Sequence, residues 1–259
     1  MNRRRLDAEM VAQGLAGDQT EAAKAIEDRL VVVDGAPGMK PSTLVDRGIP
    51  IKVDQVRRFV SRGGDKLHGA LKDFNLDVSG KRCLDAGAGS GGFTDCLLKA
   101  GAAEVVAVDV GYGQFDWTLR IDPRVRLLER TNVRHLVVPG LEGSFEVIVA
   151  DLSFVPLRSL ISTLAKLATP QATMVLLVKP QFEVSPEQVG PGGIVTDPAV
   201  WQAALESVAR GLADAGLGVV SVAPGSPRGA EGNQEFFIHA RRGARTSAGV
   251  ISAAVASVS

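Results

Sequence analysis

Asp85-Ala86-Gly87-Ala88-Gly89-Ser90-Gly91-Gly92-Phe93-Thr94 is the most informative stretch of this chain, and it directly follows a strand-like run at 82–84. A strand that passes through closely spaced glycines into a helix is typical of cofactor-binding loops in parallel α/β sheets. Gly87, Gly89 and Gly92 fit the dinucleotide fingerprint, while Gly87, Gly89 and Gly91 fit equally well the loop that binds S-adenosylmethionine. A third interpretation is a glycine-rich turn that only packs a helix on a strand.

The carboxylate of Asp85 separates the first two interpretations. It lies two residues before the first glycine, where it would repel a pyrophosphate but attract the ammonium and sulfonium groups of S-adenosylmethionine. We therefore predict a methyl-donor site in which Asp85 faces the cationic end of the cofactor and Asp109, after the next strand, takes the ribose hydroxyls. Asn132 would lie beside the adenine, although a turn residue is an equal interpretation there. The predicted backbone contacts come from Gly87, Gly89, Gly91 and Gly92.

Strand and helix patterns alternate from residue 81 to residue 243, which predicts βαβ units and a mostly parallel sheet. The fold class is therefore α/β, with a Rossmann-like sheet of the class I methyltransferase type. The last two strand-like runs are separated by 224–232 without a helix, so we expect an antiparallel hairpin at one edge. The tail, 244–259, is expected to be a weakly held helix or a frayed end. The strand-like runs are 82–84, 105–108, 125–128, 147–149, 173–178, 218–222 and 236–239.

The first sixty residues predict a small α+β unit. Apolar residues at helical spacing on either side of 14–17 indicate two short helices, and Asp34-Gly35 after a strand at 30–33 is a two-residue hairpin signal. A further strand is expected at 49–53. We predict a small N-terminal domain at 1–56, a linker at 57–63 and a catalytic domain at 64–243.

Composition excludes several classes of protein. Hydrophobic residues make up 45% and charged residues 22% of the 259 residues, as in ordinary globular chains, and no run approaches the ~18 apolar residues of a membrane span. The first residues, Met1 to Glu9, lack a signal-peptide pattern, so we expect a cytoplasmic protein. Cys83 and Cys96 have no partnering pattern for a disulfide or a zinc site, and we expect core thiols and no metal.

Charge is uneven along the chain although 29 basic and 29 acidic residues balance. The segment from Arg57 to Arg82 holds seven basic and three acidic residues, and a second basic cluster spans Arg120 to Arg134. Such clusters suit phosphate binding, and a solvated face of mixed charge is the equal alternative.

Residues at the ends of two further strands favour methylation of a hydroxyl group. Asp151-Leu152-Ser153-Phe154 lacks the Asn- or Asp-Pro-Pro-Tyr type of sequence used for base amino groups, and no cysteine lies there for carbon methylation. Lys179 emerges from an apolar strand at the edge where ligands bind, and desolvation there favours the neutral amine that a base requires. Lys66 could be a second cation nearby, and Glu235 could orient Lys179 through a charge-assisted hydrogen bond.

Eight segments of the chain match one known family: 5–7, 31–35, 60–67, 83–87, 109–114, 150–154, 178–183 and 190–193. Taken together, they resemble the TlyA family of 2′-O-ribose rRNA methyltransferases, whose catalytic domain is of the FtsJ type. The family's Lys-Asp-Lys-Glu tetrad falls on Lys66, Asp151, Lys179 and Glu235. The resemblance implies that Lys179 takes the ribose proton, that Asp151 and Lys66 position the hydroxyl, and that Glu235 steadies Lys179; Asp151 would also border the cofactor.

The resemblance also implies that residues 1–56 form an S-four-like RNA-binding domain and that the partner is rRNA in the 30S subunit, the 50S subunit or both. No DNA or membrane partner is implied, and a monomer is expected. Gly17-Asp18-Gln19 stands where that domain usually carries arginines, and Phe59, in the linker with Arg57, stands where the family tends to have tryptophan. Phosphate contacts are therefore expected from Arg3, Arg4, Arg5, Arg62 and Arg134.

The family divides into a shorter group linked to 23S rRNA and a longer group that also acts on 16S rRNA and supports capreomycin susceptibility. The basic N-terminus and the tail beyond Gly243 resemble the longer group. Three alternatives remain: an assembly factor with a vestigial methyl-donor site, a haemolysin-like membrane-active protein, and a nicotinamide oxidoreductase.

Overall fold

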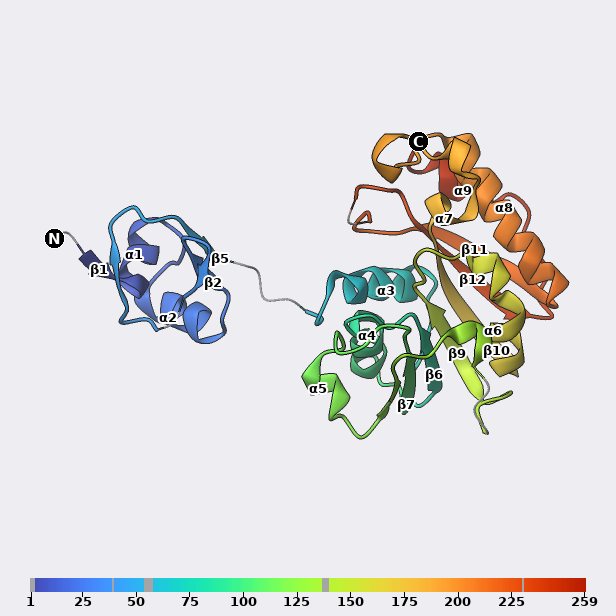
Figure 1. Cartoon of the computed structure of the whole chain (residues 1–259), viewed down its shortest axis with the longest axis horizontal. Helices are drawn as coiled ribbons and strands as arrows, with labels where there is room; N and C mark the ends of the chain where they lie inside the picture. Colours follow the sequence, from blue (N-terminus) through green and yellow to red (C-terminus); the bar gives the residue numbers. More distant parts are fainter. Residues whose placement is uncertain (1–2, 39, 54–57, 137–139, 230) are drawn as a thin grey trace. The chain divides into compact units, whose positions relative to one another are not determined.

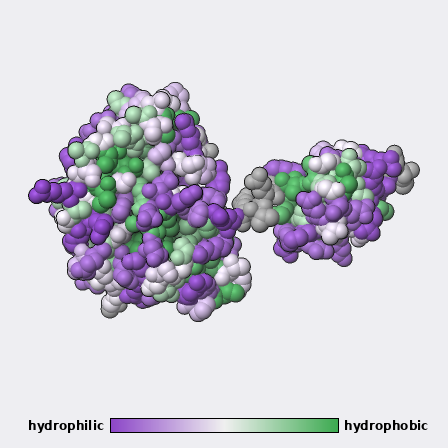
Figure 2. Space-filling model, turned by 180° about the vertical axis from the view of Figure 1, so that it is seen from behind, coloured by the Kyte–Doolittle hydropathy of each residue, from purple (hydrophilic) through white to green (hydrophobic). Residues whose placement is uncertain are grey.

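The computed structural model describes residues 3–38, 40–53, 58–136, 140–229 and 231–259. The chain forms two compact units, Met1–Arg57 and Arg58–Ser259, each with its own hydrophobic core (Figure 1). Arg57, one of the two predicted linker residues, lies outside the described residues. Hydrophilic residues are distributed over the visible face of each unit (Figure 2).

The first unit contains the two predicted helices, α1 (Leu6–Ala12) and α2 (Gln19–Glu27). Asp18 begins α2 because its side chain accepts the backbone N–H of Glu21 at 2.8 Å, which satisfies one of the donors that a helix start leaves free. Asp34 and Gly35 have φ values of 47° and 81°, as a tight hairpin turn requires, so the hairpin prediction is confirmed. The strands are β1 (Arg3–Arg5), β2 (Val31–Val33), β3 (Ala36–Pro37), β4 (Leu44–Asp46) and β5 (Ile51–Val53).

The second unit is built on a seven-stranded sheet with the order β11-β12-β10-β9-β6-β7-β8. The pairs among β6, β7, β8, β9 and β10 are parallel, and β12 runs antiparallel to both β10 and β11. The predicted α/β sheet and its antiparallel edge hairpin are therefore confirmed. The strands are β6 (Arg82–Ala86), β7 (Glu104–Val108), β8 (Val125–Leu128), β9 (Phe145–Ala150), β10 (Ala168–Val178), β11 (Leu217–Pro224) and β12 (Phe236–Arg242).

Helices cover both faces of this sheet. Successive strand residues point to opposite sides, and the apolar side chains on each side form a separate core. In β6, Leu84 packs into the core on one face and Cys83 into the core on the other. Helices α6, α8 and α9 supply the first of these cores, and α3 and α4 supply the second (Figure 1). The α-helices are α3 (Arg62–Asp73), α4 (Gly92–Lys99), α5 (Trp117–Arg120), α6 (Ile161–Leu167), α7 (Pro180–Glu183), α8 (Pro198–Asp214) and α9 (Val250–Ala256). The short 3-10 helices are η1 (Val133–His135), η2 (Leu157–Ser159), η3 (Pro186–Gln188) and η4 (Pro191–Gly193).

The C-terminal tail is more firmly packed than its composition predicts. Helix α9 buries Ala254 and Val255, and Val255 belongs to the same core as α8 and β11. The alternative of a frayed end is therefore wrong, because Val255 joins this core and the partly buried Val250, Ile251 and Val258 pack against it.

Both cysteines are buried and free, as predicted. Burial raises the pKa of the Cys83 and Cys96 thiols to about 12, which leaves them unreactive as nucleophiles. Within the described ranges, no helix combines the length and the apolar character needed to cross a membrane.

Candidate active site

The carboxyl ends of β6, β7, β9 and β10 meet at one edge of the sheet, where parallel α/β sheets bind ligands. Gly87 begins the loop after β6 with a φ of +89°, and a Cβ atom there would lie 2.3 Å from the carbonyl oxygen of Asp151. Only glycine therefore lets this loop approach the end of β9. Gly91 precedes α4 at a φ of +96°, and a Cβ atom there would meet Leu119 at 2.5 Å.

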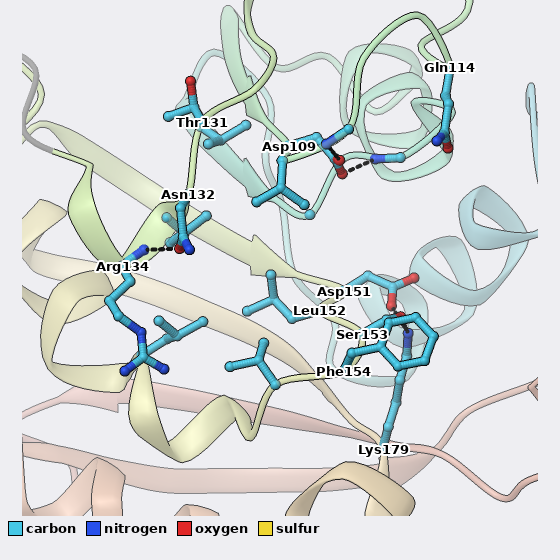
Figure 3. A pocket seen from close by; sticks show the side chains of 18 residues that line it. Asp109, Gln114, Thr131, Asn132, Arg134, Asp151, Leu152, Ser153, Phe154 and Lys179 are labelled. Carbon is cyan, nitrogen blue, oxygen red and sulfur yellow. Dashed lines mark hydrogen bonds and ion pairs between the residues drawn. The ribbon is translucent and has the colours of Figure 1, made fainter. Parts of the chain in front are cut away.

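A cavity of about 570 Å³ opens beside the glycine loop (Figure 3). Gly87, Gly89, Asp109 and Asn132 all line it, as the methyl-donor interpretation predicts. Asp109 accepts the backbone N–H groups of Gly89 at 2.8 Å and of Gly111 at 2.6 Å, so it ties the glycine loop to the end of β7. The side chain of Asn132 accepts the N–H of Arg134 at 2.9 Å, which makes it the cap of η1 as well as a cavity residue.

A second cavity, of about 320 Å³, adjoins the first and shares Gly87, Gly89, Asp151 and Lys179 with it. Its wall is completed by α3 and by the segment before β12, and the residues from these elements include Ser61, Arg62, Lys66 and Glu235. Gly92 also lines this cavity. The shared residues mark the point where the two cavities meet.

All four tetrad residues come together at this meeting point, although they span 169 positions of the chain. Lys179 Nζ lies 2.5 Å from Asp151 Oδ1 and donates a hydrogen bond to Ser153 Oγ at 2.9 Å (Figure 3). Lys66 Nζ lies 2.5 Å from Glu235 Oε2. The side chains are mostly buried, with 12% of Lys179, 11% of Lys66 and 5% of Glu235 exposed.

The predicted contact between Glu235 and Lys179 is wrong. Glu235 pairs with Lys66 on α3, and Lys179 pairs with Asp151 at the end of the neighbouring parallel strand. With two cations and two carboxylates at one sheet edge, the pairing depends on where α3 packs, which no local pattern specifies. Ser153, for which no sequence pattern predicted a role, supplies a second oxygen to Lys179.

Asp85 lies beneath the glycine loop. It is fully buried, accepts the Thr94 hydroxyl at 2.7 Å, and has one carboxylate oxygen, Oδ1, without a hydrogen-bond partner among the described residues. Burial raises the pKa of Asp85 to about 7; the Thr94 hydrogen bond opposes that rise and the nearby Asp151 charge adds to it. Asp85 does not line either of the two cavities, so the structure gives it no direct path to a ligand there.

The residues predicted to contact phosphate fall into two groups. Arg62 and Arg134 line the second and first cavities respectively, and Arg134 also donates a hydrogen bond to Ser159. The three N-terminal arginines already have carboxylate partners: Arg3 with Asp46 at 3.2 Å, Arg4 with Glu9 at 3.3 Å and Arg5 with Asp7 at 2.6 Å.

The basic cluster from Arg120 to Arg134 is not a continuous anion-facing surface. Arg120 pairs with Glu129 at 2.8 Å, Arg124 pairs with Asp122 at 2.7 Å, and the Arg130 guanidinium lies 4.1 Å from the centre of the Tyr112 ring. These partners neutralise or cover much of the cluster's charge.

Phe59 is a core residue of the second unit, with 4% of its surface exposed. Its ring lies 5.7 Å from that of His68, and a Cβ atom on Gly64 would lie 2.3 Å from Phe59. The next residue, Val60, donates its N–H to Asp95 of α4 at 2.9 Å. Phe59 thus has a packing role, for which a phenyl ring suffices.

Phe154 is a further functional candidate, beyond the residues predicted from the sequence. The residue is 90% exposed, its φ is +62°, and its ring lies 5.2 Å from that of Phe182. It lines the first cavity beside Lys179. The sequence does contain an indication of this role, because an aromatic residue three positions after Asp151 lies in or beside the site. Periodicity alone, however, cannot distinguish an exposed ring from a buried one.

Comparisons with known proteins agree with this geometry. The FtsJ-like methyltransferase family matches residues 59–242. The chain is 47% identical to the 16S/23S rRNA (cytidine-2'-O)-methyltransferase TlyA of Mycobacterium tuberculosis, over 92% of this chain and 90% of that protein. It is 33% identical to the 23S rRNA (cytidine-2'-O)-methyltransferase TlyA of Campylobacter jejuni, over 70% of each chain. A solved structure from Streptococcus thermophilus, described as a hemolysin, superposes with a TM-score of 0.73 at 35% identity and covers 99% of this chain and 96% of that one.

Proposed function

The chain belongs to the FtsJ-like methyltransferase family, and from this membership we propose that it methylates the ribose 2′-hydroxyl of a cytidine in rRNA, using S-adenosylmethionine. The observation that carries the proposal is the meeting of Lys66, Asp151, Lys179 and Glu235 where the two cavities join. The relatives named as cytidine-2'-O-methyltransferases support the substrate class.

The residues around the two cavities fit S-adenosylmethionine. Asp109 suits the ribose hydroxyls, Asn132 suits the adenine edge, and Gly89 has open space where a side chain could obstruct a ligand, while Gly87 lets the loop lie against the end of β9. Gly91 caps α4, and Gly92, the first residue of that helix, lines the second cavity, so the start of α4 would lie near the cofactor. When bound, this cofactor supplies an electrophilic methyl group carried on a sulfonium centre.

Lys179 is the proposed base. An ammonium group cannot accept a proton, so the neutral form of this amine takes the proton of the ribose 2′-hydroxyl onto Nζ as the oxygen attacks, and the contacts to Asp151 and Ser153 fix where Nζ lies. Lys66, held by Glu235, orients the hydroxyl from the other side. Positioning supplies much of the rate in such a displacement, and a general base adds ~100- to 10,000-fold.

The first unit is proposed to dock on folded rRNA. Arg3 would exchange Asp46 for a phosphate, which is feasible because both side chains of this ion pair are exposed and such pairs contribute little to stability. Arg4 and Arg5 would contact phosphates while they keep the buried carboxylates of Glu9 and Asp7 as partners, because a buried carboxylate without a partner is costly. Arg62 and Arg134 would contact the backbone that flanks the target nucleotide.

The test is transfer of labelled methyl to purified 16S and 23S rRNA and to intact 30S and 50S subunits, followed by mapping of ribose methylation. Methylation of both rRNAs would match the relative from M. tuberculosis, and methylation of 23S rRNA alone would match the relative from C. jejuni. If the protein binds the cofactor but no substrate accepts a methyl group, the proposal fails and an RNA-binding assembly factor becomes the better account.

Phe154→Ala is expected to weaken the productive binding of RNA. An exposed ring beside the base suits stacking of a nucleobase that has left its helix, a contact worth ~1–3 kcal/mol. We expect kcat/KM for RNA to fall by ~10- to 100-fold, a larger change than that in the Kd for S-adenosylmethionine, whose cavity Phe154 also lines. Phe154→Trp should restore the rate and Phe154→Leu, apolar but unable to stack, should not; equal rates for all three variants would exclude a stacking role.

A further inference from the structure

The two loops that carry Asp151 and Lys179 are joined at a second point, away from the tetrad. One loop follows β9 and leads into η2, and the other follows β10 and forms α7. At their far ends, Glu183 of α7 contacts Leu157 and Arg158 of η2. Nothing in the reaction described above uses this contact.

Glu183 is nearly inaccessible, with 1% of its side chain exposed. Its Oε1 accepts the backbone N–H of Leu157 at 2.5 Å, and its Oε2 lies 3.4 Å from the Arg158 guanidinium. The same guanidinium donates a hydrogen bond to the backbone carbonyl of Glu183. The two loops are therefore joined through both the side chain and the backbone of one residue.

Burying this carboxylate is unfavourable in itself. Burial raises the pKa of Glu183, and the contacts to Leu157 and Arg158 oppose that rise. An apolar side chain would fill the same volume without the desolvation penalty, but it could not accept the Leu157 N–H. What the carboxylate contributes is therefore a directional bond between two particular loops.

The connection from Glu183 back to the reacting groups is short. Lys179 directly precedes the single helical turn α7, and Glu183 is its last residue. The turn begins at Pro180, whose ring restricts φ. The rings of Phe154 and Phe182 bridge the two loops between the Glu183 contact and the pair of Lys179 with Asp151. A displacement at η2 would therefore reach the amine of Lys179.

We propose that Glu183, with Arg158, is a positioning residue that holds Lys179 and Asp151 at the separation that methyl transfer requires. This inference rests on the proposed function. Glu183 touches neither cavity, so its effect is expected on the rate of the chemical step and not on the affinity for the cofactor. Misplacement of a catalytic group by about 1 Å can cost ~100-fold in rate.

The experiment compares Glu183→Ala, Glu183→Gln and Arg158→Met with the wild-type protein. Single-turnover methyl transfer is measured at saturating cofactor and RNA, together with the Kd for S-adenosylmethionine, the Tm and the hydrogen exchange of the amides at 151–157. Asp122→Ala is the matched control, because Asp122 also accepts a backbone N–H and pairs with an arginine, but in the connection between α5 and β8. Arg158 is 43% exposed, so Arg158→Met tests the contact if Glu183→Ala does not fold.

We expect Glu183→Ala to slow the single turnover ~10- to 100-fold, with an unchanged Kd for the cofactor and faster exchange at 151–157. Glu183→Gln keeps an acceptor for Leu157 and should recover most of the rate, Arg158→Met should lose part of it, and Asp122→Ala should lose none. A wild-type rate per folded, cofactor-binding molecule in Glu183→Ala, or losses of rate and cofactor affinity in equal proportion, would overturn the positioning role. An inactive wild-type protein would instead overturn the proposed function, and this inference with it.

Discussion

Lys179→Arg is expected to reduce methyl transfer by ~100- to 10,000-fold, the usual contribution of a general base. Arginine keeps the positive charge that pairs with Asp151, so folding is preserved, but its guanidinium does not lose a proton in proteins. Lys179→Met, which removes both the charge and the base, should be equally slow. Each variant should bind S-adenosylmethionine with nearly the wild-type Kd, measured by calorimetry.

The comparison of these two variants separates a base from a charge. If Lys179 only stabilised negative charge, Lys179→Arg would retain most of the single-turnover rate and Lys179→Met would not. Lys166→Met, at an exposed position of α6, is the control for replacing lysine with methionine and should have the wild-type rate. A rate for Lys179→Arg within a few-fold of the wild type would exclude Lys179 as the base.

Much of the second unit could be predicted from the sequence, because the local pattern of apolar residues agrees with their burial in the folded sheet. The apolar runs at 105–108 and 173–178 became strands of the buried sheet, since a parallel sheet covered on both faces needs continuous apolar segments. Gly87 could be placed in the cofactor loop from its glycine motif, but its close approach to the Asp151 carbonyl depends on how the loop packs on β9 and could not be predicted. The packing of α9 was underestimated, because a run of alanine, serine and valine contains little to distinguish a core helix from a loose end.

The site could be predicted as a set of residues but not as a set of contacts. Strand ends identify Asp151 and Lys179 as neighbours, because parallel strands present their carboxyl ends at one edge. The partner of Glu235 depends on the packing of α3 against the sheet, a long-range feature without a sequence signal. Glu183 was quoted within a matching segment but has a role only once η2 lies against α7.

Asp85→Asn is expected to stabilise the protein above neutral pH and to leave it nearly unchanged at pH 4. The ordinary pKa of an aspartate is 3.8, and burial raises the pKa of Asp85 to about 7 in the folded protein. The folded state therefore holds a proton that the unfolded state releases between these two values. As pH rises through this window, Asp85 lowers the free energy of unfolding by up to about 4 kcal/mol, and above it the full cost of a buried carboxylate remains.

Asparagine does not ionise in this range, so the difference in unfolding free energy between Asp85→Asn and the wild type should grow from pH 4 to pH 7 and then level off. Urea unfolding at several pH values, read by circular dichroism, measures that difference. Asp85→Asn should also weaken binding of S-adenosylmethionine at pH 8, because the unpartnered Oδ1 atom then carries negative charge beneath the glycine loop and attracts a cationic ligand even without touching it. A stability difference that does not vary with pH would show that Asp85 is ionised throughout, and an unchanged affinity at pH 8 would leave Asp85 a purely structural role.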